Sequence, residues 1–154
     1  MGVLILGLLV AAFYGVMNVG NVTYFVDMGL LDLEHNARQA MNYLTTDLRA
    51  SFDVSIDNSD PSHITFATPQ FPATEFRHID SNGDGVRDRI VRQREGQIRI
   101  IANEISDLCF CWDAVNNNCR ADCTDLFTIR VRAAKNAGQR PLSFILIEQV
   151  RSRN

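Results

Sequence analysis

The hydrophobic pattern of the chain changes twice, and the changes divide it into three segments. The first segment, residues 1–26, carries no side chain that is charged at neutral pH. A helix of that length covers roughly 39 Å, against about 30 Å for the hydrocarbon core of a bilayer. The pattern therefore predicts a membrane-spanning helix. We expect a kink or local melting near Gly15 to Asn21, because each interior glycine weakens a helix.

The second segment, residues 27–52, continues the helix in amphipathic form. Its apolar side chains recur at steps of three and four, and polar side chains occupy the opposite face. Glu34 lies four residues before Arg38, an order that adds a few tenths of a kcal/mol to helix stability. The apolar stripe comprises Leu30, Leu33, Ala37, Ala40, Met41, Leu44, Leu48 and Phe52.

The third segment, residues 53–154, has the pattern of a β-rich head domain. Short runs of branched and aromatic residues alternate with turn clusters. In the clearest strand, Phe127, Ile129, Val131 and Ala133 alternate with polar residues, as expected for a sheet with one buried face. The fold class is therefore α+β, with an antiparallel sheet packed on the amphipathic half of the helix. The predicted strands span residues 63–68, 74–79, 87–94, 97–102, 105–112, 125–134 and 141–150.

Charge and motif content argue against two functional classes. The formal net charge is −3, and the basic residues are interleaved with acidic ones, which argues against a nucleic-acid partner. We expect the arginines between 87 and 99 to form a solvated, salt-bridged sheet face with Asp88 and Glu95. The chain contains no G-x-S-x-G, H-E-x-x-H or P-loop pattern, so we do not expect an enzyme.

The order of three phrases along the chain carries a family resemblance. The apolar segment leads into ARQAMNYLTTDLRASF (37–52), then into an acidic glycine-rich loop and hairpin (79–100), and then into ANEISDLCFCWD (102–113). This order resembles the type IV pilin superfamily, and within it the minor pilins and the J-type minor pseudopilins of type II secretion.

The resemblance implies a structural subunit that is anchored in the bacterial inner membrane by one helix. Such a subunit assembles with other pilin-like subunits into a filament that is extracellular or periplasmic, and a pilus or secretion machinery drives the assembly. The head faces outward. We expect lipid contacts before assembly, and filament-core contacts afterwards, from Leu4, Leu8, Leu9, Ala12, Phe13 and Val16.

One feature of the family is missing from the chain. The Gly-Phe-Thr-Leu-x-Glu cleavage and methylation motif does not occur, although residues 2–13 resemble the stretch that follows it. We expect the natural start to lie several residues upstream; the alternative is a divergent subunit without the glutamate. A cleaved signal peptide is a poorer interpretation, because no basic region precedes the apolar run and no clean small-residue cleavage site follows it.

The segment HIDSNGDGVRD (78–88) has the spacing of a calcium loop. Position 12 is Val91 rather than a bidentate glutamate, so the EF-hand pattern is incomplete and we expect a dissociation constant of about 10⁻⁴ to 10⁻³ M. A hairpin turn is the alternative, because Asn-Gly and Asp-Gly are favoured turn dipeptides. Clustered carboxylates repel one another without a cation, which favours a structural Ca²⁺. The predicted ligands are Asp80, Asn82, Asp84, the carbonyl of Val86 and Asp88, with Gly85 at the sharp turn.

Four cysteines lie within fifteen residues: Cys109, Cys111, Cys119 and Cys123. Three disulfide pairings are possible in principle. A strand that returns through residues 115–118 would place Cys111 near Cys119 and Cys109 near Cys123, so we expect nested disulfides in an oxidising compartment. A zinc site made of four thiolates is the alternative, although such sites more often contain C-x₂-C pairs.

Two functions of other classes stay open from the sequence. The first is a single-pass, membrane-anchored calcium-binding adhesion module that does not polymerise. The second is a membrane-tethered enzyme whose catalytic residues come together only in the fold.

Overall fold

A single helix, α1 (Gly2–Arg49), forms the first third of the molecule. The computed structural model describes residues 2–120, 122–123, 126–137 and 140–153; within these ranges the side chains of residues 2–4, 137 and 140 are not described. The helix is unbroken over 48 residues, so the kink or local melting predicted near Gly15 to Asn21 is wrong. Glycine lowers helix propensity but, unlike proline, keeps the N–H that the hydrogen-bond ladder needs.

The described residues of the head form three antiparallel sheets, which follow the helix in the chain. The largest is a five-stranded meander in sequence order: β1 (Phe52–Asp57), β2 (Asp60–Ala67), β3 (Thr74–Ile79), β4 (Arg89–Arg94) and β5 (Gln97–Asn103). The second sheet has the order β10 (Arg140–Arg151), β9 (Leu126–Ala137) and β6 (Ile105–Cys109). The third is the small pair β7 (Trp112–Asp113) and β8 (Asn118–Cys119).

The helix ends at Arg49, three residues before the predicted boundary at residue 52. The N–H of Ser51 donates to the Leu48 carbonyl at 3.2 Å, and the Ser51 hydroxyl donates to the same carbonyl at 2.7 Å. These bonds close the last turn, and Phe52 then pairs with Ala67 as the first residue of β1. Phe52 is 43% exposed, so its predicted place in the buried helical stripe is wrong.

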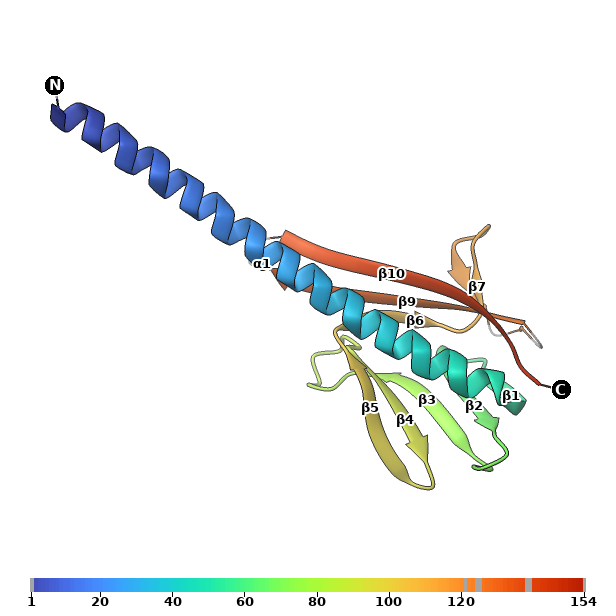
Figure 1. Cartoon of the computed structure of the whole chain (residues 1–154). Coiled ribbons are helices and arrows are strands. Elements are labelled where there is room, and N and C mark those ends of the chain that lie inside the picture. The colour runs from blue at the N-terminus through green and yellow to red at the C-terminus, as the bar shows by residue number, and fades with distance from the viewer. Residues whose placement is uncertain (1, 121, 124–125, 138–139, 154) are drawn as a thin grey trace.

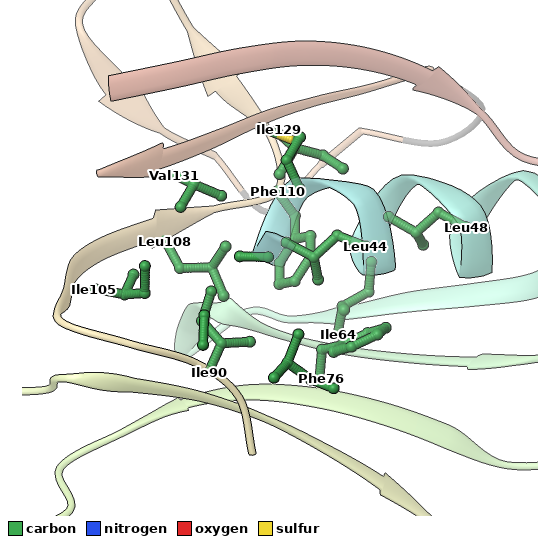
Figure 2. Packing of buried hydrophobic residues seen from close by; sticks show 14 of the residues in the cluster. Leu44, Leu48, Ile64, Phe76, Ile90, Ile105, Leu108, Phe110, Ile129 and Val131 are labelled. Atoms are coloured by element: carbon green, nitrogen blue, oxygen red, sulfur yellow. The ribbon is translucent and has the colours of Figure 1, made fainter. Parts of the chain in front are cut away.

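The hydrophobic core lies between the second half of α1 and the two larger sheets. The helix packs against β9, β10 and β5, and its side chains Leu44 and Leu48 are fully buried. Figure 2 shows these leucines with Ile129 of β9 on one side and Ile64 of β2 on the other. Each large apolar side chain buried in this way stabilises the fold by roughly 1.5 to 3 kcal/mol. The predicted α+β arrangement is therefore confirmed.

The two halves of α1 lie in different surroundings. The second half runs beside β10, β9 and the five-stranded sheet, whereas the first half extends beyond every strand of the head (Figure 1). The head thus holds the helix by its C-terminal half and leaves the N-terminal half projecting.

Candidate functional site

The projecting half of α1 exposes apolar side chains on all sides. From Ile5 to Phe25 the large apolar residues are 46% to 73% exposed. Of the predicted membrane and filament contacts, Leu8, Leu9, Ala12, Phe13 and Val16 are all exposed, and the side chain of Leu4 lies outside the described residues. Among the residues that the structure describes, this helix is the one long and apolar enough to cross a membrane. It is therefore compatible with a single membrane anchor.

A cluster of three charged side chains, Asp32, Glu104 and Lys135, joins the helix to the head just beyond the apolar segment and is called the clasp below. Asp27 is the first side chain that is charged at neutral pH, and five residues later Asp32 accepts a hydrogen bond from the Lys135 ammonium of β9 at 2.6 Å. The same ammonium donates to Glu104 at 3.2 Å. The hydrogen bond to Asp32, helped by Glu104, raises the pKa of Lys135. These contacts fix the direction of α1 relative to the head.

The acidic loop between β3 and β4 is closed by hydrogen bonds to its own backbone. The Asp80 carboxylate accepts from the N–H groups of Gly85 and Gly83, each at 2.7 Å, and of Asn82 at 3.1 Å. The bond from Gly85 is the largest cause that lowers the pKa of Asp80. Gly83 and Gly85 have φ of 78° and 84°, a left-handed conformation that favours glycine.

The other predicted ligands of the loop also have partners within it. Asp84 accepts from the N–H of Val86 at 2.7 Å and from the Asn82 amide at 3.0 Å. Asp88 accepts from the Ser81 hydroxyl at 2.5 Å, which lowers the pKa of Asp88. Within the described part of the chain, no group of three or more His, Cys, Asp or Glu side chains could hold a metal ion. The loop has the predicted turn, and calcium binding stays a prediction without a preformed ligand cluster to support it.

Arg87 anchors this loop to the start of β2. Its guanidinium donates to Asp60 at 2.8 Å and to the Ser62 hydroxyl at 2.5 Å. Burial by itself raises the pKa of Asp60, but the hydrogen bonds from Arg87 and Ser62 outweigh it and lower that pKa to about 2.

This pair makes head stability depend on pH in a defined window. Because the pKa of Asp60 is lowered on folding, its contribution is full above about pH 4, the value for an unfolded aspartate, and disappears as pH falls towards 2. We expect Asp60→Asn to lower the free energy of unfolding by about 1 kcal/mol at pH 7, allowing for solvent screening, and by nothing near pH 2. Urea titrations of the unaltered protein and of the Asp60→Asn variant in detergent, followed by Trp112 fluorescence, measure this difference in the free energy of unfolding. An equal deficit at both pH values would contradict it.

Salt bridges do form among these arginines, but the predicted solvated face is wrong for Arg92 and Arg94, whose side chains are only 15% and 19% exposed and face the helix. Arg92 and Arg94 bond to Asp47 of α1 at 3.1 Å and 2.6 Å, rather than to Glu95. The guanidinium groups of Arg92 and Arg99 also lie 5.6 Å and 5.9 Å from the centre of the Tyr43 ring. The arginines therefore bind the five-stranded sheet to the helix.

All four cysteines form disulfides, Cys109–Cys119 and Cys111–Cys123, with Cα–Cα distances of 5.7 Å and 5.9 Å. The disulfides are confirmed, and the predicted nested pairing is wrong because the bonds interleave. The returning strand does form, but its register places Cys119 opposite Trp112, and the N–H of Arg120 donates to the Cys111 carbonyl. Cys119 is thus one position out of register with Cys111. Oxidised cysteines do not supply the thiolates of a zinc site.

Some contacts of the site were not predicted from the sequence. The clasp at Lys135 and the role of Asp47 both depend on residues far apart in the chain. The one available signal for the clasp is that Lys135 is the only lysine in the sequence. Phe110, next to the disulfide-bonded cysteines in sequence, is fully buried, and Trp112 lies under the Arg130 guanidinium, which is 3.4 Å from the ring centre.

Comparison with known proteins gives no match to a family model, a curated protein or a solved structure. Function is therefore argued from the geometry of the chain itself.

Proposed function

We propose that this chain is a pilin-like structural subunit of a type IV pilus or a type II secretion pseudopilus. The observation that carries the proposal is the continuous α1, of which the second half is the central core element of the head and the first half is exposed and apolar on every side. An apolar surface of this extent requires lipid or protein as a partner. A subunit that is first anchored in a membrane and later packed in a filament has lipid as the partner of this surface at first and protein afterwards.

The dimensions of the helix support the membrane stage. Residues 2–26 precede the first charged side chain, Asp27, and a helix of that length is roughly 37 Å long. This exceeds the hydrocarbon thickness of about 30 Å, so the segment spans the bilayer with some tilt. The disulfides of the head suit an oxidising compartment, which supports a head on the outer side of the inner membrane.

The surface of the helix supports the assembly stage. Polymerisation would replace the lipid around residues 2–26 with helices of neighbouring pilin-like subunits. Gly7, Ala11, Ala12 and Gly15 permit close approach of a second helix, and a Cβ added at Gly7 or Gly15 would meet no atom within 4 Å. Because lipid tails are as apolar as leucine, the hydrophobic effect does not drive this exchange. An assembly machinery therefore supplies the work.

Fractionation of cells that carry the chain and its filament system tests the proposal. We expect the chain in the membrane fraction and also in sheared filaments, where antibodies against the head label it by immunogold. A chain that stays entirely in the membrane while the cell makes filaments would reject the filament role and leave the membrane anchor.

The acidic loop favours a second candidate function, a membrane-anchored calcium-binding adhesion module that does not polymerise. The Asp84 carboxylate is exposed, those of Asp80 and Asp88 are partly exposed, and the turn already has the conformation that its two glycines allow. In this candidate, and equally in a filament subunit, Ca²⁺ would stabilise the loop rather than take part in a reaction.

Calcium is expected to stabilise the head against unfolding. With a dissociation constant of about 10⁻⁴ to 10⁻³ M, 10 mM Ca²⁺ raises the free energy of unfolding by about 1.4 to 2.7 kcal/mol. Urea titration of the full chain in detergent, with Ca²⁺ or with EDTA, measures the difference. Asp80→Asn should remove it, whereas Asp122→Asn, an exposed carboxylate paired with Arg120 outside the loop, should keep it. Coincident curves for the unaltered chain would show that the loop is only a turn.

A further inference from the structure

Two amide side chains lie within the exposed apolar segment of α1. Asn18 and Asn21 are exposed, and neither has a hydrogen-bond partner for its side chain among the described residues. The nearby Thr23 differs, because its hydroxyl donates to the Val19 carbonyl of the same helix at 2.9 Å. Asn18 is nine residues before Asp27, so it lies roughly 13 Å from the first charge along the helix axis. This depth is inside the hydrocarbon of a bilayer.

Asn18 belongs to a face of the helix that is otherwise small or apolar. With 3.6 residues per turn, positions 7, 11, 15, 18 and 22 fall within about 80° of the helix circumference. The residues at these positions are Gly7, Ala11, Gly15, Asn18 and Val22. Asn21 lies about 60° from Asn18 and nearer to the membrane boundary, where its amide reaches water or lipid headgroups. Asn18 is therefore the amide that has no source of hydrogen bonds within lipid.

We propose that this face binds the same face of a second copy of the chain in the membrane, with the Asn18 amides of the two copies hydrogen-bonded to each other. The inference rests on the membrane-spanning part of the proposed function and names the partner of the segment before filament assembly. A buried amide without a partner is costly in hydrocarbon. The second copy satisfies it, because each amide carries both donors and an acceptor.

Symmetry favours a second copy over other occupants. Copies that are anchored with their heads on the same side run parallel, so identical positions lie at the same depth and Asn18 meets Asn18. Acyl chains offer no hydrogen-bonding group to the amide. The small side chains at positions 7, 11 and 15 allow the two backbones to approach, as in other closely packed transmembrane pairs.

Disulfide cross-linking of the full chain in phosphatidylcholine vesicles tests the proposal. No free cysteine is present, so one added cysteine supplies the only reactive thiol. Ala11→Cys places the thiol about 20° from Asn18 around the helix, and Val16→Cys places it about 160° away as the matched control. Under copper-phenanthroline oxidation we expect at least about five times more covalent dimer from Ala11→Cys.

Asn18→Leu in the Ala11→Cys background separates the amide from general packing. Leucine is similar in size and more apolar, so membrane insertion should improve while the dimer yield falls about fivefold. Asn18→Gln, which keeps the amide, should retain most of the dimer. Equal yields from Ala11→Cys and Val16→Cys, or no loss with Asn18→Leu, would overturn the proposal.

Carbonate extraction of the same vesicles distinguishes this inference from the proposed function. If the unaltered chain is extracted as a soluble protein, both the membrane anchor and the pairing are wrong. If the chain stays inserted but the two cysteines cross-link equally, only the pairing is wrong. If Asn18-dependent dimers form and the chain is absent from filaments, the pairing stands and the filament role falls.

Discussion

Leu8→Arg is expected to abolish incorporation of the chain into filaments while the head stays folded. Leu8 is 71% exposed on the projecting half of α1, so its replacement disturbs no contact within the head. An arginine within the hydrocarbon costs about 2.5 to 3.5 kcal/mol on insertion scales. The same guanidinium would have to be buried without a partner between neighbouring helices in a filament core. Leu9→Arg should act in the same way.

The measurement is immunogold labelling of filaments, combined with Trp112 fluorescence of the purified variant as a test of head folding. Val115→Arg is the matched control, because Val115 is also apolar and is 92% exposed, but it lies on the head between β7 and β8. We expect this control to be incorporated normally. Normal incorporation of Leu8→Arg would refute the role assigned to the apolar helix.

Removal of the disulfides is expected to have the largest effect on head stability. The bonds Cys109–Cys119 and Cys111–Cys123 close loops of sequence separation 10 and 12. Loop-closure entropy for lengths of this order gives about 3 kcal/mol for each bond. Loss of both therefore removes a large share of the 5 to 15 kcal/mol by which domains are usually stable. We expect a destabilised head in the reducing environment of a cytoplasm.

Paired alanine variants measure these contributions by urea titration. The double variant Cys109→Ala and Cys119→Ala should lower the free energy of unfolding by about 3 kcal/mol. The double variant Cys111→Ala and Cys123→Ala should lower it by about the same amount. A single variant tests the connectivity: Cys123→Ala should leave Cys111 as the thiol that alkylates after unfolding. Alkylation at Cys109 instead would show that the interleaved pairing is wrong.

The elements with a regular period could be predicted from the sequence. Phe127, Ile129 and Val131 alternate with polar residues and are all buried, because one face of β9 covers the helix. The helical stripe was equally clear from Leu33 to Leu48, and every predicted strand occurs within a few residues of its expected position. Local period is a reliable guide where a single buried face decides which side chains point inward.

The parts that depend on contacts between distant segments could not be predicted. Whether Cys111 bonds to Cys119 or to Cys123 is decided by a one-residue difference in the register of the β7–β8 hairpin. The end of α1 was placed too late because Phe52 continues the helical period, whereas pairing with Ala67 makes it part of a strand. The ligand pattern of the acidic loop is visible in the sequence, but the hydrogen bonds from Gly83 and Gly85 to Asp80 are not.

The unbroken α1 also decides how the molecule responds to mechanical force. Strands β9 and β10 run alongside the second half of the helix (Figure 1), and Asp32 and Asp47 tie it laterally to Lys135 and Arg94. A pulling force along the projecting half of α1 therefore loads these lateral contacts in shear. Many of them must break together before the helix slides out of the head. Tension applied at one end of the molecule reaches its centre without a flexible joint to absorb it.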